Sequence, residues 1–257
     1  MISIIIPTFN NEQVFLQCLT SIVNFTEGVD YEVIVVLNGE DYKTNKKKLM
    51  LVGNKPETTG FANVDNTPLD NVRYIKAPSN LGWMGGINLA KNVVKGEYIL
   101  LLNDDTQIPD FNSDWLLKLK EVLDNYSYCV AVAPVSSNIS GEQNTQYSQY
   151  IPRRLHKTSF LSGCCVLLKK DTIDKVGWLD ENLCGGDDID LSIRLMDNHG
   201  SLFIRRDVHI LHKYATTGKK LYGEYWDSRD HSDNIQMDLI RKHGLKRVLL
   251  FNRGYCN

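Results

Sequence analysis

The sequence of 257 residues predicts an α/β fold with a mostly parallel, doubly wound sheet flanked by helices. Continuously apolar runs such as SIIIPTF and YEVIVVLNG indicate strands that are covered on both faces. Segments with apolar residues at helical spacing, such as NNEQVFLQCLTSIVNF, alternate with these runs. Strands and helices that alternate over short connections are typical of a Rossmann-like sheet, which binds ligands at the carboxyl ends of its strands.

The first half of the chain continues this alternation. NVRYIKA and EYILLLN predict a third and a fourth strand, and WMGGINLAKNVVKG predicts a helix that is closed by Gly96. The segment from Lys43 to Pro68 is lysine-rich and then polar, so we expect a variable excursion from the core there.

The pattern changes after Asp105. DWLLKLKEVLDN predicts a helix, CVAVAPV a strand, and residues 136–157 a polar loop. FLSGCCVLLKK predicts another strand, followed by a helix from about Asp187 to Gly200 and by the strand SLFIRRDVHIL. We therefore expect three parts: residues 1–105, residues 106–226 of the same domain, and a helical tail of residues 227–257.

Composition narrows the class of protein. The formal charge of −2 argues against nucleic acid as the main partner, and no apolar run approaches the roughly 20 residues of a membrane span. The N-terminus has no basic leader, which predicts a cytoplasmic protein. Six cysteines without CxxC spacing indicate buried thiols rather than a zinc site or a disulfide framework.

The stretch ILLLNDDTQIPD carries the strongest chemical signal. Asn103, Asp104 and Asp105 follow a buried strand, and two adjacent carboxylates repel each other unless a partner offsets them. Hard oxygen ligands suit Mg²⁺ or Mn²⁺, which share substrate phosphates. An Asx-turn that closes the strand is the alternative.

Two further stretches are candidates for donor binding. In PTFNN, the residues Pro7, Thr8 and Asn10 suit a loop that binds a base or ribose edge, or else Asn10 or Asn11 only caps a helix. In NLGWMGGIN, glycines let the backbone approach a ligand, or else they let a helix pack closely on the sheet.

The stretch GGDDIDLSIRL places Asp187, Asp188 and Asp190 in the first turn of a helix. Acids there stabilise the helix dipole, but a general base would be equally well placed. Gly185 and Gly186 leave room beside such a base for a substrate hydroxyl.

Taken in order, these stretches resemble the inverting glycosyltransferases of family two, which have the GT-A fold, and in particular their rhamnosyltransferase-like branch. The resemblance spans roughly Ser3 to His212 and is carried by SIIIPTFN, EVIVVLNG, NLGWMGGIN, NDD, LSGCCVLLKKDTIDKVGWLDENL and DDIDLSIRL. LNGED replaces the acid that often ends the second strand, so Asn38 or Asp41 is expected to substitute for it.

The resemblance implies roles for individual residues. It implies Asp188 as the general base, Asp105 and His212 as ligands of Mn²⁺ or Mg²⁺ with His209 as the competitor for the histidine, and Asp187, Gly163 and Trp178 on the acceptor side. On the donor side it implies Pro7, Thr8, Asn10, Asn38, Asn80, Gly82, Asn88, Asn103 and Asp104. Trp83 and Trp178 either stack on sugar or base or belong to the core.

The implied activity is the transfer of a sugar from a nucleotide-diphosphate sugar to a hydroxyl of a glycan or lipid-linked glycan. Residues 1–105 would bind the donor and residues 106–226 the acceptor. A sugar nucleotidyltransferase would need a glycine-rich basic loop after the first strand, where PTFNNEQ stands. A non-catalytic binding module is the other alternative. For the tail, packing on the core, a homodimer contact and a peripheral membrane helix remain open.

Overall fold

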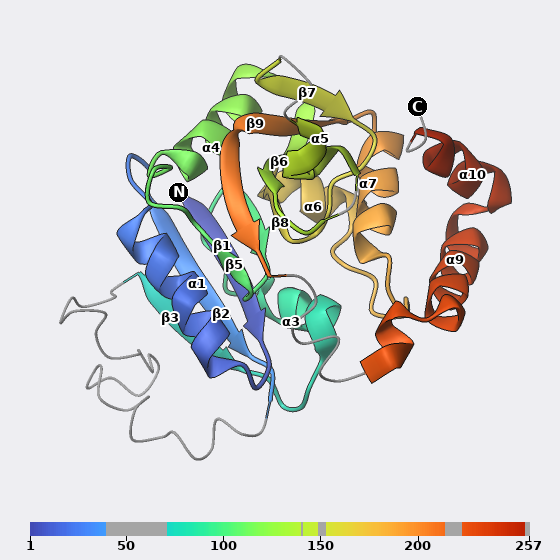
Figure 1. The fold of residues 1–257 in the computed structure, drawn as a ribbon, viewed down its shortest axis with the longest axis horizontal. Coiled ribbons are helices and arrows are strands. Elements are labelled where there is room, and N and C mark those ends of the chain that lie inside the picture. Colours follow the sequence, from blue (N-terminus) through green and yellow to red (C-terminus); the bar gives the residue numbers. More distant parts are fainter. Residues whose placement is uncertain (40–70, 140, 149–152, 214–222, 255–257) are drawn as a thin grey trace.

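The computed structural model describes residues 1–39, 71–139, 141–148, 153–213 and 223–254. Within these ranges, nine strands form one mixed sheet that lies between helices on both faces (Figure 1). The expected excursion from Lys43 to Pro68, together with Asp41, lies outside the described residues.

The bounds of the elements follow the chain. The strands are β1 (Ile2–Thr8), β2 (Tyr31–Leu37), β3 (Val72–Lys76), β4 (Tyr98–Leu102), β5 (Thr106–Gln107), β6 (Cys129–Ser136), β7 (Leu155–Thr158), β8 (Cys165–Lys169) and β9 (Ser201–His212). The helices are α1 (Glu12–Asn24), α3 (Gly82–Ala90), α4 (Trp115–Asn125), α5 (Thr145–Ser148), α6 (Lys170–Val176), α7 (Asp187–Asp197), α9 (Arg229–His243) and α10 (Leu245–Gly254), with short 3₁₀ turns η2 (Gly141–Gln143) and η3 (Gly223–Asp227).

The strand directions bring several chain ends to one edge of the sheet. The order is β3-β2-β1-β4-β8-β6-β9-β5, and β7 pairs with β9. β1 to β4 run parallel, β8 is antiparallel to both β4 and β6, and β9 is parallel to β6. The carboxyl ends of β1, β2, β4, β6 and β9 therefore share one edge with the amino end of β8.

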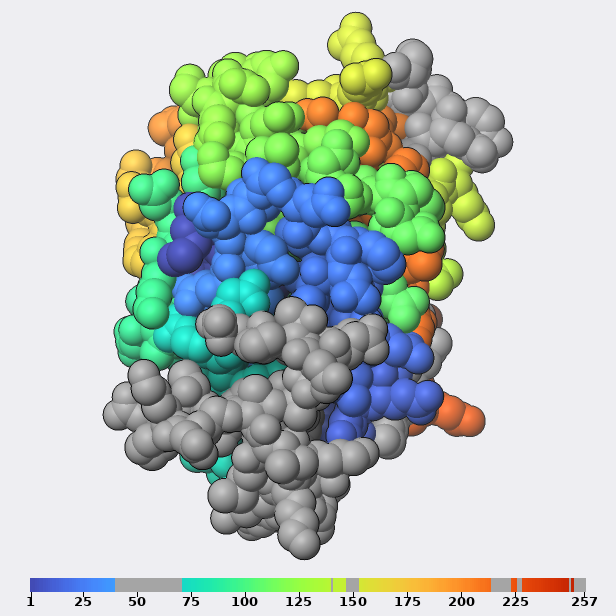
Figure 2. Space-filling view, turned by 90° about the vertical axis from the view of Figure 1, so that its left-hand side faces the viewer, coloured from blue at the N-terminus to red at the C-terminus, as the bar shows by residue number. Residues whose placement is uncertain are grey.

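Side chains alternate between two apolar layers, as expected for a sheet buried on both faces. Ile4 and Ile6 join the layer under α1 and α4, which includes Trp115. Ile5 joins the opposite layer under α3 and α7, which includes Ile87. Figure 2 looks onto the α1 side, where the blue N-terminal segment lies against the green segment that contains α4.

The predicted strands of the first half are confirmed, whereas the second predicted helix, which corresponds to α3, is shorter than expected. It ends at Ala90, and Val93 and Val94 turn back onto the Ala90 carbonyl instead of extending it. Gly96 is needed for another reason: a Cβ there would lie 2.6 Å from the Ser3 backbone nitrogen, so Gly96 lets the chain pass close to β1.

The tail packs on the rest of the chain. α9 and α10 lie beside α7 (Figure 1), and Leu239, Val248 and Phe251 are each 2% exposed. Phe251 also meets Phe160 edge-on, with ring centroids 6.1 Å apart. These contacts support the packing interpretation. No helix in the described ranges is long and apolar enough to cross a membrane.

Candidate active site

The NDD turn and the end of β9 form one side of the candidate site. β5 continues from the turn and pairs with β9, so Thr106 lies opposite His212. The His212 Nε2 atom is 3.1 Å from Asp105 Oδ1 and 3.2 Å from Asn103 Nδ2. The Lys213 backbone N–H donates to the Asp105 carbonyl at 3.0 Å. The structure therefore brings together Asn103, Asp105 and His212, as the resemblance implies.

His209 does not reach this turn. It pairs with Val135 in the sheet, and its carbonyl accepts a hydrogen bond from Asn112 at 2.9 Å. Burial lowers the pKa of its imidazole. Of the two histidines, His212 is thus the one beside Asp105.

Asp104 is buried, and only one oxygen of its carboxylate is hydrogen-bonded within the described residues. The Thr8 hydroxyl at the end of β1 bonds to this carboxylate, but its Oδ2 atom is buried without a hydrogen-bond partner among the described residues. Burial raises the pKa of Asp104 to about 7, and the charge of Asp105 adds to this effect. A buried carboxylate oxygen of this kind is stabilised by a cation, by a hydrogen-bond donor or by protonation of the carboxyl group.

The residues of the turn fit a hard cation that also binds substrate. In the described part of the chain, no group of three or more His, Cys, Asp or Glu side chains is arranged to hold a metal by itself. Mg²⁺ and Mn²⁺ commonly take one or two carboxylates from the protein and complete their shell with phosphate oxygens and water. Asp105, His212 and the spare oxygen of Asp104 suit that mode of binding.

The second side of the site is the first turn of α7. Gly186 precedes the helix with φ of 70°, a conformation that favours glycine. The Asp188 carboxylate accepts two backbone hydrogen bonds, from Gly163 at 3.3 Å and from Ile189 at 2.9 Å. Burial raises the pKa of Asp188, and these hydrogen bonds oppose the rise. Its orientation is therefore fixed by the loop before β8.

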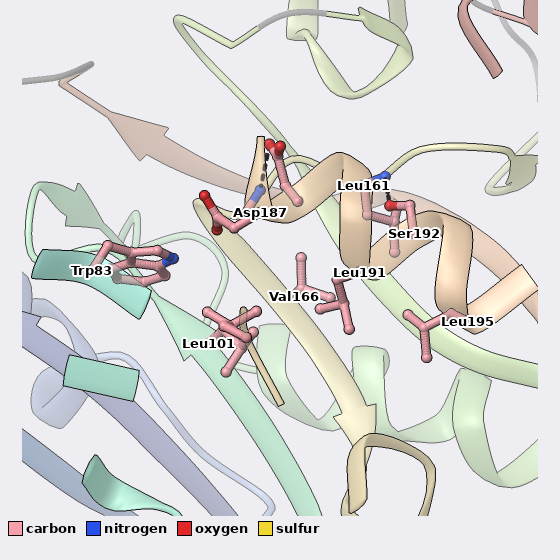
Figure 3. Close-up of a pocket in the computed structure, with 11 residues that line it drawn as sticks. Trp83, Leu101, Leu161, Val166, Asp187, Leu191, Ser192 and Leu195 are labelled. Carbon is pink, nitrogen blue, oxygen red and sulfur yellow. Dashed lines mark hydrogen bonds between the residues drawn. The ribbon is translucent and has the colours of Figure 1, made fainter. Parts of the chain in front are cut away.

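Asp187 points toward α3 instead. Its carboxylate faces the Trp83 indole, which favours the charged form (Figure 3). Burial, and then the charge of Asp188, raise the pKa of Asp187 to about 7. Below Asp187 and Asp188 lies a small apolar cavity lined by residues of α3, β4, β8 and α7, among them Leu101, Val166 and Leu191.

Trp83 is the main residue that the sequence analysis did not assign to the site. The sequence leaves Trp83 open as a core residue or a stacking platform, because nothing in it places α3 next to α7. The available signal was its position inside NLGWMGGIN, a stretch already expected to approach a ligand.

The two sides of the site are hydrogen-bonded to each other. Leu102 pairs with Cys165 across β4 and β8, and the Asn103 backbone N–H donates to the Cys164 carbonyl at 3.0 Å. The NDD turn and the Gly163 loop that holds Asp188 are therefore neighbours at one edge of the sheet.

Several residues expected on the donor side make structural contacts. The Asn38 amide is used by the α3 start, accepting from Leu81 N–H and donating to the Gly82 carbonyl, both at 2.7 Å. The Asn88 amide bonds to Leu179 and Glu181. These contacts use both asparagine amides to hold α3, and the donor-side role of the two residues stays a prediction.

Pro7 and Trp178 also pack within the protein. A Cβ on Gly86 would lie 2.8 Å from Pro7 Cβ, which shows how closely α3 approaches β1. Trp178, expected on the acceptor side, is 8% exposed and its indole donates to Asp174 at 2.8 Å. Its ring thus belongs to the core, which was the alternative for this residue.

Three further donor-side residues lie in turns or at the start of α3. Asn80 is exposed and its Oδ1 accepts from Gly82 N–H at 3.0 Å. Gly82 has φ of 67° and open space around it. Asn10 has φ of 47°, and its side chain lies close to Gly39.

Comparison with known proteins identifies the family and the fold of the chain. The family model described as glycosyl transferase family 2 matches residues 3–177. A poly(ribitol-phosphate) beta-glucosyltransferase of Bacillus spizizenii is 35% identical over 109 residues, which are 42% of this chain and 15% of that protein. The chain thus spans only a small part of that relative.

Solved structures share the fold at low sequence identity. The mannosyltransferase PcManGT from Pyrobaculum calidifontis, in complex with GDP-Man and Mn²⁺, superposes with a TM-score of 0.67 at 16% identity. That alignment covers 93% of this chain and 64% of the other. S. aureus TarS (residues 1–349) superposes with a TM-score of 0.56 at 15% identity, over 83% of this chain and 60% of the other.

These structures confirm the predicted GT-A fold. The family match does not distinguish between branches, so the rhamnosyltransferase-like branch stays a prediction. The match covers more than half of the sequence and includes the NDD turn. The chain therefore belongs to glycosyl transferase family 2.

Proposed function

We propose that this glycosyltransferase moves a sugar from a nucleotide-diphosphate sugar to an acceptor hydroxyl by a single inverting displacement. The observation that carries the proposal is the link between the two sides of the site. The loop that fixes Asp188 is hydrogen-bonded to the turn that contains Asp105. In this proposal the link sets the base next to the diphosphate site, as a one-step transfer requires.

Asp105 and His212 would hold the divalent cation, with Asp104 beside them. When bound, Mn²⁺ or Mg²⁺ offsets the negative charge of the diphosphate leaving group. The protein itself supplies a pre-built turn: the β5–β9 pairing fixes Asp105 against His212 before any ligand arrives. Thr8, Asn10, Asn80, Gly82 and Asn103 remain the proposed donor contacts around it.

Asp188 would remove the proton from the acceptor hydroxyl. A general base works best with a pKa near the working pH, and burial raises the pKa of this carboxylate in that direction. Its two backbone donors hold it in one orientation. Attack from the face opposite the diphosphate inverts the anomeric carbon. Asp187 and Gly163 would shape the acceptor side.

The acceptor is proposed to be a glycan, a lipid-linked glycan or a related polymer. The Bacillus spizizenii relative is named for poly(ribitol-phosphate), a polymer that carries hydroxyl groups. A cytoplasmic location, a homodimer and a peripheral membrane contact stay predictions.

Thermal-shift measurements with UDP, GDP, ADP, CDP and dTDP, each with Mn²⁺ or Mg²⁺, would identify the nucleotide. The matching sugar nucleotides would then be tested for transfer, and the product anomer would be read by NMR. We expect inversion. Retention of configuration would contradict the single displacement, and binding without any turnover would favour the non-catalytic module.

A further inference from the structure

Helix α9 covers the turn that precedes Asp187 and Asp188, the acid pair at the start of α7. A Cβ on Gly185 would lie 2.8 Å from Ile235 Cδ1, and a Cβ on Gly186 would lie 2.8 Å from Ile235 Cγ2. The Cys184 backbone N–H donates to the Asp238 carboxylate at 3.2 Å. Glycine is therefore required at both positions so that α9 can seat against the backbone just before Asp187 and Asp188.

Asp190, the third acid of the motif, is the centre of the contact between α7 and α9. Its side chain is 0% exposed. Within α7, Arg194 contacts it through Nε at 2.9 Å and Nη2 at 2.8 Å. From α9, Lys242 Nζ lies 2.9 Å and His243 Nε2 lies 2.7 Å from its Oδ1 atom.

This cluster joins three parts of the chain. Arg194 also donates to the carbonyls of Val176 and Gly177 at the end of α6, at 3.0 and 2.5 Å. Lys242 also pairs with Asp180 at 2.5 Å. The first turn of α7 is thereby anchored to α6, to the segment before the acid pair and to the tail.

The cluster lies in the same helical turn as the proposed base. The Asp190 backbone N–H donates to the Gly186 carbonyl at 2.9 Å, so Asp190 closes the turn that contains Asp188. A buried carboxylate tolerates little change in its partners, because an uncompensated buried charge is costly. Any displacement of Asp190 would therefore shift the backbone that carries Asp188.

We propose that Asp190 is a positioning residue: held by Lys242 and His243 of α9, it fixes the first turn of α7 and so keeps the Asp188 carboxylate against the Gly163 loop. This inference rests on the proposed role of Asp188 as the base. It also gives the C-terminal tail a part in catalysis that packing alone would not require.

The test removes the contact between Asp190 of α7 and Lys242 and His243 of α9 from each helix in turn, and it includes a matched control. Asp190→Asn changes the α7 side, and Lys242→Met and His243→Asn change the more accessible α9 side in case the buried variant fails to fold. Arg247→Gln is the control, because it breaks another ion pair between the tail and α7, Arg247–Asp197 at 2.6 Å, at the far end of the helix. Lys242→Arg keeps the positive charge and should therefore retain the wild-type transfer rate that Lys242→Met loses.

Three measurements are made on each full-length variant: hydrogen exchange of the peptide that spans residues 184–190, affinity for the nucleotide with Mn²⁺, and transfer rate. We expect Lys242→Met and His243→Asn to raise the exchange of this peptide at least tenfold and to lower kcat at least tenfold. Nucleotide affinity should change less than twofold. Arg247→Gln should leave exchange and kcat within twofold of wild type.

The proposal is overturned if Asp190→Asn folds and transfers at the wild-type rate, or if Arg247→Gln has the same effect as His243→Asn. The second result would mean that the tail acts only through general stability. If the wild-type protein shows no transfer at all, the proposed function fails, while the exchange data still decide whether the cluster holds this turn.

Discussion

His212 Nε2 lies 3.1 Å from Asp105 Oδ1, although the two residues lie far apart in the sequence. The contact is made by a strand pairing of only two residues, β5 with the end of β9. Both side chains are 6% exposed, so solvent does little to screen them. A cation at this place would be held by groups that the fold has already brought together.

We expect Asp105→Asn to abolish the metal-dependent binding of nucleotide, because it removes the charged ligand nearest His212. The thermal shift given by the matching nucleoside diphosphate with Mn²⁺ should disappear, as it should in excess chelator. Asp110→Asn is the control, since Asp110 is an exposed acid that closely follows the turn. A full shift in the presence of chelator would exclude the metal role.

Asp188→Asn should remove transfer and leave donor binding nearly intact. The carboxylate faces the Gly163 loop, so its loss should lower kcat by a hundredfold or more with little change in nucleotide affinity. Asp171→Asn provides a comparison, because Asp171 is an exposed acid in the first turn of α6. A transfer rate within a few-fold of wild type would show that Asp188 is not the general base and only stabilises the start of α7.

Replacement of Asp187 should stabilise the protein at alkaline pH. Burial raises the pKa of Asp187 from 3.8 to about 7, so between these values the folded state binds a proton that the unfolded state has lost. Stability from this group is therefore lost as the pH rises through that window. We expect Asp187→Asn to gain roughly 1–2 kcal/mol at pH 8, less than the full shift implies because the side chain is partly exposed.

At pH 4 most of this gain should disappear, because the carboxyl group is still protonated in the folded state and only about half ionised in the unfolded state. Urea unfolding of the variant and of wild type at the two pH values checks this expectation. An equal effect at both would show that ionisation of Asp187 is not the cause.

Gly186→Ala should destabilise more than Gly82→Ala. Both glycines have positive φ, 70° and 67°, so each substitution incurs a backbone cost of about 1–2 kcal/mol. Only at Gly186 would the new Cβ also collide with α9, at 2.8 Å from Ile235, which adds roughly 1–3 kcal/mol. Urea unfolding separates the two terms, and Ile235→Ala should relieve the second one. Equal losses would contradict the close seating of α9.

Truncation after Asp227 should give an insoluble or strongly destabilised protein, because α9 and α10 bury Leu239, Val248 and Phe251 against the core. Expression, solubility and size-exclusion chromatography test this. A stable monomer from a dimeric parent would identify the tail as an interface instead. A stable, fully active enzyme that no longer binds anionic liposomes would identify it as a membrane helix.

The strands and the NDD turn could be predicted because their signals are local. Buried parallel strands are continuously apolar, and a pair of acids at a strand end is rare without a partner. The choice between His209 and His212 could not be made in this way. The register of β6 against β9 shifts between Pro134 and Val135, and such an irregularity breaks the simple alternation of faces.

The contacts of Trp83, Asn38 and Asp190 also could not be predicted from the sequence. Tryptophan and asparagine occur in cores, in turns and in ligand sites. The contacts that such a residue makes depend on which distant element packs against it, and the sequence does not show this. Asp190 carries a usual helix-start signal, whereas its partners Lys242 and His243 come from a tail for which the family resemblance offers no guide.

The pairing of β4 with β8 has a consequence for how the protein holds together. The expected boundary between residues 105 and 106 falls between these hydrogen-bonded strands, so a cut there would leave two fragments, each with a long, bare and apolar sheet edge. Exposed edges of this kind promote aggregation. Fragments 1–105 and 106–257 should therefore precipitate when made separately and regain a common fold only when refolded together, because the two halves of the sheet melt as one cooperative unit.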